Sequence, residues 1–158
     1  MDVQNLYYSA RNLHKSKVNY NSLIRQAVNG RTLIRAICYC IKTKEEHEDS
    51  FLKALEKIGF EVKAKDLQVF YGGAKKGDWD VGIAMDMIEL APKIDVAVLI
   101  SGDGDYVPLV QHLGRGYGCK VEVLAFGKSA SSMLKEAADV FIDLEKDAKN
   151  FLIRGGKK

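Results

Sequence analysis

Two aspartates, Asp103 and Asp105, stand two residues apart in the glycine-flanked stretch SGDGDY at residues 101–106. The stretch directly follows residues 94–100, a continuous apolar run that is typical of a buried parallel strand. Aspartate in a glycine-flanked loop is commonly only a turn residue. In a parallel α/β sheet, however, ligands bind just beyond the carboxyl ends of the strands, where this pair is expected to lie. The pair is therefore a candidate ligand site.

Two further aspartates stand in similar settings. Asp2 leads the polar segment DVQNLYY, and Asp80 stands near the start of a helix expected over residues 77–92. If these loops converge with Asp103 and Asp105, the four carboxylates repel one another strongly unless a cation lies among them. By itself, Asp80 is equally well explained as a favourable charge at a helix N-terminus.

The chemistry of such a carboxylate group indicates a particular kind of metal. Oxygen ligands select hard cations, Mg²⁺ or Mn²⁺, which also bind phosphates. The sequence has no His and Cys spacing of the kind that binds zinc. A hard cation favours metal-assisted hydrolysis of a phosphodiester, in which the metal polarises the phosphoryl oxygen and lowers the pKa of an attacking water.

Other side chains near these acids are candidates for contact with a nucleic acid. Lys75 and Lys76 precede the helix of Asp80, where they could meet phosphates, although loop lysines are usually only solvated. Ser129 is expected to start a helix whose free N–H groups could receive a phosphate, and simple capping explains it as well. Four aromatic residues could stack on unpaired bases or serve in packing: Tyr7, Tyr8, Tyr71 and Trp79.

Hydrophobic periodicity predicts the elements that must position these residues. Helices are expected over residues 18–30, 43–59, 77–92, 106–118, 129–138 and 145–154. Strands are expected over residues 31–42, 60–65, 67–73, 94–100, 119–127 and 139–144. This alternation predicts an α/β domain with a mainly parallel sheet and helices on both faces. Asp86 follows Asp80 by six residues, about 240° around the helix, so we expect its side chain in solvent.

Composition narrows the class of protein. The 158 residues suit one domain, and 47% hydrophobic and 28% charged residues are typical of a globular chain. No apolar run approaches the roughly 18 residues of a membrane span, and the N-terminus lacks the apolar centre of a signal peptide. Three cysteines, an odd number, indicate buried thiols in a reducing cytoplasm and not a disulfide framework. The net charge of +3 is compatible with nucleic-acid binding without requiring it.

Taken in order, three segments resemble the NYN-domain proteins of the LabA-like group, within the PIN-like nuclease superfamily. The segments are DVQNLYY, KKGDWDVGIAMDM and LISGDGDYVPLVQHLGRGYGCKVEVLAFGKSASSMLKEAADVFIDL. The resemblance implies a three-layer αβα sandwich over residues 1–145, with the helix end and basic tail of residues 146–158 outside the domain. It also implies a Mg²⁺- or Mn²⁺-dependent ribonuclease acting on RNA, which we expect to be single-stranded.

The resemblance assigns roles to residues that match the family motifs. It carries over Asp2 and Asn5 from the motif D-x-x-N, Asp80 from D-V-G-I-A, and Asp103 and Asp105 from S-G-D-G-D-Y. The four aspartates are thus expected to bind metal and act in catalysis, and Asn5 to contact substrate.

One departure concerns the N-terminus. In the family, the residue matching Asp2 ends an apolar central strand, whereas here only Met1 precedes it. We therefore expect a truncated first strand, two exposed strand edges and a mobile Asp2. This departure favours an alternative function, a catalytically weak RNA-binding or regulatory adaptor on the same fold. A phosphoryl-transfer domain with an acceptor aspartate explains the dispersed acids less well, and a homo-oligomer is compatible with the sequence.

Overall fold

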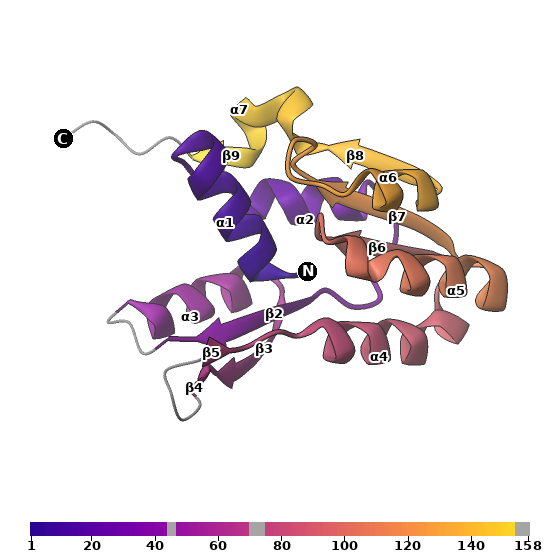
Figure 1. Ribbon diagram of the computed structural model, residues 1–158, viewed down its shortest axis with the longest axis horizontal. Coiled ribbons are helices and arrows are strands. Elements are labelled where there is room, and N and C mark those ends of the chain that lie inside the picture. The colour runs from indigo at the N-terminus through magenta and orange to yellow at the C-terminus, as the bar shows by residue number, and fades with distance from the viewer. Residues whose placement is uncertain (44–46, 70–74, 154–158) are drawn as a thin grey trace.

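The computed structural model describes residues 1–43, 47–69 and 75–153 (Figure 1). The helices are α1 (Val3–His14), α2 (Tyr20–Val28), α3 (Glu48–Ile58), α4 (Asp80–Leu90), α5 (Val107–Tyr117), α6 (Ser132–Ala137) and α7 (Ala148–Phe151). Short 3-10 turns are η1 (Ala91–Lys93), η2 (Gly104–Tyr106) and η3 (Leu144–Asp147). The strands are β1 (Lys17–Val18), β2 (Ile37–Lys42), β3 (Glu61–Asp66), β4 (Gln68–Val69), β5 (Lys75–Lys76), β6 (Val96–Ile100), β7 (Lys120–Ala125), β8 (Val140–Asp143) and β9 (Leu152–Ile153).

Two parallel blocks of strands form the centre of the molecule. In one block β2 pairs with β3, and in the other β7 lies between β6 and β8. Residues 1 and 2 join the blocks: the Asp2 N–H donates to the Ile100 carbonyl of β6, and the Tyr39 N–H of β2 donates to the Met1 carbonyl, both at 3.0 Å. The predicted mainly parallel sheet is therefore confirmed.

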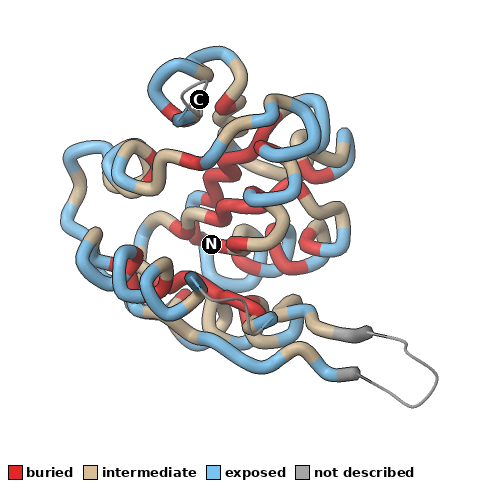
Figure 2. The backbone as a smooth tube through the Cα atoms, turned by 90° about the vertical axis from the view of Figure 1, so that its left-hand side faces the viewer, coloured by how far each residue is buried: buried red, intermediate tan, exposed pale blue. Residues whose placement is uncertain are grey.

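Strands β2, β6 and β7 are largely buried because helices cover both faces of the sheet, whereas β3 is mostly exposed. Along β2, Cys38 and Cys40 belong to one core cluster, whereas Ile37 and Tyr39 belong to the other, as expected from the alternation of side chains along a strand. Helices α1, α2 and α3 supply residues to the first cluster, and α4, α5 and α6 supply residues to the second. Figure 2 shows the buried residues concentrated between exposed outer segments. This arrangement confirms the three-layer αβα sandwich.

A groove separates β2 from β6 beyond the point where residues 1 and 2 join them. It has a volume of about 620 Å³, and Met1, Ile37, Val98 and Ile100 are among its lining residues. Within the described residues, β2 otherwise pairs only with β3, and β6 only with β7. Among the described residues, Met1 and Asp2 alone bridge these two strands, and no described strand pairs with the facing edges of β2 and β6 along the groove.

The N-terminus itself is held in place, contrary to the expectation of a mobile Asp2. Met1 is buried, and its ammonium group donates to the Ile37 carbonyl at 2.8 Å. Burial in the apolar groove lowers the pKa of this amine from 8.0 to about 6, because desolvation disfavours its charged form. Asp2 is held in place because hydrogen bonds join Met1 to β2 and Asp2 itself to β6.

Both ends of the chain differ from the sequence-based expectation. Residues 3–14 form helix α1, which the polar segment at the N-terminus did not lead us to predict. Residues 145–154 do not form one helix: the described part is divided among η3, α7 and β9, and β9 pairs antiparallel with β1. None of the described helices is long and apolar enough to cross a membrane.

Candidate metal centre

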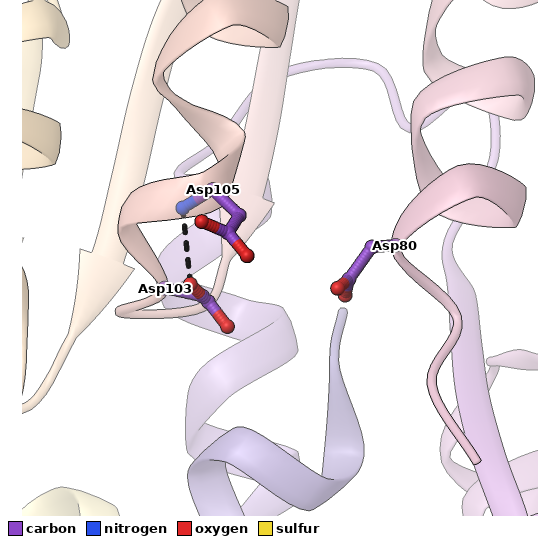
Figure 3. Close-up of side chains that lie close together, drawn as sticks. All are labelled: Asp80, Asp103 and Asp105. Carbon is purple, nitrogen blue, oxygen red and sulfur yellow. Dashed lines mark hydrogen bonds between the residues drawn. The ribbon is translucent and has the colours of Figure 1, made fainter. Parts of the chain in front are cut away.

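Three carboxylates meet at the carboxyl end of β6. Asp103 and Asp105 come from the loop and 3-10 turn that follow the strand, and Asp80 is the first residue of α4. Their nearest ligand oxygens all lie within 4.8 Å of one another. Figure 3 shows Asp80 facing Asp103 and Asp105 across a short gap. The structure thus brings together residues that are separated by more than twenty positions in the sequence.

The loop that carries Asp103 and Asp105 has a fixed shape. The Asp105 N–H donates to the Asp103 carboxylate at 3.0 Å, and the Asp103 N–H donates to the buried Ser101 hydroxyl at 3.3 Å. A Cβ at Gly102 would lie 3.0 Å from a backbone atom of the neighbouring loop. A Cβ at Gly104 would lie 2.9 Å from a serine hydroxyl in that loop. Glycine at both positions lets this loop pack against residues 130–131.

Tyr106 orients the third carboxylate. Its ring is 2% exposed, and its hydroxyl donates to Asp80 Oδ1 at 2.8 Å. Desolvation, followed by the charges of Asp2 and Asp80, raises the pKa of Tyr106 above its ordinary value, so the phenol remains a donor. Sequence reasoning missed this residue, although it directly follows Asp105. Its position at the end of SGDGDY was the available signal.

Asp2 lies beside the three carboxylates and caps α1. Its Oδ1 accepts from the Asn5 N–H at 3.1 Å, and its Oδ2 accepts from the Ser101 hydroxyl at 3.4 Å. Burial raises the pKa of Asp2, and the charges of Asp80 and Asp103 raise it further, while the Asn5 hydrogen bond opposes them. Asp2 is therefore close to the site but outside the group of three whose oxygens lie within 4.8 Å.

The electrostatics of the group suit a cation. Desolvation raises the pKa of Asp80, the hydrogen bond from Tyr106 opposes this, and the charges of Asp103 and Asp105 add to the rise. These groups repel one another when all are ionised, and a cation among them removes that repulsion. The donor atoms are carboxylate oxygens alone, which is the ligand set that Mg²⁺ and Mn²⁺ prefer.

Asn5 ties α1 to the acidic loop. Its side-chain Oδ1 accepts from the Gly102 N–H at 2.9 Å, across the junction between α1 and the end of β6. The hydrogen bond fixes the backbone directly before Asp103. The observed contact of Asn5 is thus with the loop that holds the carboxylates.

The start of α4 is anchored to β2 and β3. The Trp79 ring packs 5.4 Å from the Tyr39 ring, so the structure places this tryptophan in packing. Asp86 is not in solvent as expected: its carboxylate accepts from the Tyr39 hydroxyl at 2.6 Å and from the Lys63 ammonium. Burial alone would raise the pKa of Asp86, but these two hydrogen bonds hold it below its ordinary value.

The apolar face expected for this helix was partly wrong, because Val81 and Met85 are exposed and α4 buries Ile83 instead. Asp86 flanks this buried side, so partners on β2 and β3 reach it and fix the helix that begins at Asp80.

Ser129 differs from the expectation in its place in the fold. It does not start a helix, because residues 126–130 form a turn in which the Ser129 N–H donates to the Phe126 carbonyl at 3.1 Å. Helix α6 begins only at Ser132. The Ser129 hydroxyl donates to the Ser9 hydroxyl of α1 at 2.9 Å, so this turn contacts the helix that Asp2 caps.

The remaining predicted contacts are only partly described. Lys75 and Lys76 form β5, which pairs antiparallel with β4 and leads toward the start of α4. The side chains of these two lysines, and all of Tyr71, lie outside the described part of the chain.

Comparison with known proteins gives consistent results. The family model described as NYN domain matches residues 1–145. The chain is 27% identical over 126 residues to the Low amplitude and bright protein LabA of Synechococcus elongatus, covering 76% of this chain and 67% of that protein. A crystal structure of a protein of unknown function from Vibrio parahaemolyticus RIMD 2210633 superposes with a TM-score of 0.87 at 36% identity. That match covers 96% of this chain and 91% of the other.

Proposed function

The chain belongs to the NYN domain family, and from this membership we propose that it is a metal-dependent ribonuclease. The observation that carries the proposal is the group of three carboxylates, whose oxygens lie within 4.8 Å of one another at the end of β6. An RNA phosphodiester is the substrate class, and single-stranded RNA is the form we favour.

Asp80, Asp103 and Asp105 would hold Mg²⁺ or Mn²⁺ in this proposal. Their oxygen-only donor set and their mutual repulsion both fit a hard cation. When bound, such an ion polarises the phosphoryl oxygen and lowers the pKa of the attacking water.

The chain's own groups hold these carboxylates ready. Tyr106 fixes one oxygen of Asp80, and the Asp105 N–H fixes one oxygen of Asp103. Asp2 adds a fourth carboxylate beside them, and its hydrogen bonds to Asn5 and Ser101 hold it there. We assign Asp2 to catalysis together with the three, through the negative charge it adds at the site.

RNA would be held by groups around the acids. We assign Lys75 and Lys76 to phosphate contacts, supported by the position of β5 directly before α4. Asn5 and Ser129 are assigned to the same substrate face, because both lie where α1 meets loops that follow strands of the sheet.

A cleavage assay tests this proposal. Labelled, unstructured RNA is incubated with the protein in Mg²⁺, in Mn²⁺ and in EDTA. We expect cleavage only with metal, and its near-complete loss in Asp103→Asn. The matched control is Asp95→Asn, because Asp95 is an exposed aspartate just before the opposite end of β6. Asp103→Asn cleaving as fast as the parent would show that the metal assignment is wrong. RNA binding in EDTA without any cleavage in metal would instead indicate the RNA-binding adaptor.

We also place the protein in the cytoplasm. Cys38, Cys40 and Cys119 are buried free thiols, which supports a reducing compartment.

A further inference from the structure

Two tyrosines on α1 present their rings to solvent without a packing role in the core. Tyr8 is 51% exposed and Tyr7 is 44% exposed. The rings lie edge to face, with centroids 5.3 Å apart and an interplanar angle of 73°. Arg11 holds the ring of Tyr7 in place. Its guanidinium lies 5.9 Å from the Tyr7 ring centroid and donates to the Tyr7 hydroxyl at 3.1 Å. Tyr8 is therefore an exposed aromatic ring braced by a second ring.

The position of α1 relates this ring to the carboxylates. Asp2 caps the helix beside the acidic group, and Asn5 turns toward the loop before Asp103. Tyr8 follows Asn5 by three residues, which places it about 60° around the helix from Asn5 and one turn farther along. From Asp2 the distance along the axis is about 9 Å at 1.5 Å per residue. Tyr8 thus lies within reach of a nucleotide next to a phosphate held at the carboxylates.

The charges along the same helix favour a polyanion. Residues 3–14 contain no acidic side chain. Arg11, Lys15 and Lys17 follow in order along the helix and the strand after it, and all three are exposed. An RNA strand that runs from the carboxylates along α1 would therefore bring its phosphates close to these three positive side chains.

We propose that Tyr8, braced by Tyr7, stacks on an unpaired base of RNA bound at the carboxylates and so selects single strands. An aromatic ring accepts any base with a free π-face, which makes the contact tolerant of sequence. In a duplex, neighbouring bases already cover these faces, so the ring has no base to accept. The inference rests on the proposed function, because it takes RNA as the ligand of the same site.

Binding in EDTA tests the contact apart from cleavage. The probe is a short, unstructured, fluorophore-labelled RNA, and its anisotropy gives the dissociation constant. We expect Tyr8→Ala to weaken binding about tenfold, the range of one lost base stack, and Tyr8→Phe to bind like the parent. The salt dependence of binding should be the same in Tyr8→Ala as in the parent, because no charge is removed. The matched control is Tyr117→Ala, which removes a tyrosine that is 41% exposed on α5.

The same RNA is then scanned with single abasic nucleotides and compared with a blunt-ended duplex of the same sequence, which has no unpaired base. The proposal expects one abasic position that weakens the parent as much as Tyr8→Ala does, with no further loss when the two are combined. Equal binding of parent and Tyr8→Ala, or an equal loss on the duplex, overturns the stacking contact even if the protein cleaves RNA. The expected pattern with no cleavage in metal supports stacking while overturning the nuclease. A parent that binds no RNA overturns both.

Discussion

Removing the charge of Asp103 should stabilise the metal-free protein while strongly reducing its stabilisation by metal. Asparagine keeps the shape of the side chain and an Oδ1 that accepts from the Asp105 N–H. What changes is the repulsion within the group of three. At 4.8 Å, two unit charges repel by about 0.9 kcal/mol in surroundings as polar as water.

Only part of this repulsion changes the free energy of unfolding. Asp103 and Asp105 remain neighbours in the unfolded chain, so their repulsion is largely present in both states. Asp80 meets them only in the folded state, and we expect Asp103→Asn to add about 1 kcal/mol to the free energy of unfolding. For a chain of this length, that corresponds to a melting temperature higher by about 2–4 °C.

Thermal melts in EDTA and in Mn²⁺ measure both effects. Metal at about 100 times its dissociation constant should add about 2.7 kcal/mol to the parent's free energy of unfolding, and much less to that of Asp103→Asn. Asp95→Asn serves as the control, with a response to metal like the parent's. The reasoning is refuted if Asp103→Asn melts with the parent in EDTA, or if Mn²⁺ stabilises both proteins equally.

Three further predictions follow from the site and the groove. Tyr106→Phe removes the hydroxyl that donates to Asp80 but keeps the buried ring, so calorimetry should show Mn²⁺ binding weakened about tenfold. An unchanged affinity for Mn²⁺ would show that Tyr106 does not position Asp80 for the metal. The buried Met1 amine has its pKa lowered from 8.0 to about 6, so the unfolded state binds more protons between these values. The free energy of unfolding should therefore be greatest above pH 8 and fall by about 2.7 kcal/mol in total as the pH is lowered through 6. Urea titrations at several pH values should reveal this fall. The fall should vanish in a variant with apolar residues added before Met1, because the Met1 nitrogen then belongs to a peptide group, which does not titrate. If the fall persists in that variant, the amine is not its source. Replacing Lys75 and Lys76 by Ala should lower the slope of log K against log salt by about 0.7 for each lost phosphate contact on single strands. An unchanged slope would show that neither lysine contacts a phosphate of the RNA.

The sequence by itself determined the central strands and most of the helices, but not helix α1 or the division of residues 145–153 among η3, α7 and β9. The apolar run of residues 94–100 predicts the buried strand β6. The glycine-flanked aspartates directly follow this strand in the structure, as the sequence predicts. The C-terminal ends of α2, α3 and α5 were also readable, because local signals mark them: Asn29 and Gly30 after α2, Gly59 after α3 and Gly118 after α5 all adopt positive φ. Such signals depend on neighbours in the chain, which is why one sequence suffices to find them.

Only the tertiary structure decided which of these residues meet. Asp80 joins Asp103 and Asp105 because α4 packs against η2, the turn that holds them, whereas Asp2 caps α1 just outside the group. Tyr106 reaches Asp80 for the same reason, and Asp86 finds partners on strands far away in the sequence. The groove between β2 and β6 likewise depends on strand order. Periodicity records which face of an element is apolar, but the distance between two loops depends on how whole elements pack, and that is set by contacts between residues far apart in the chain.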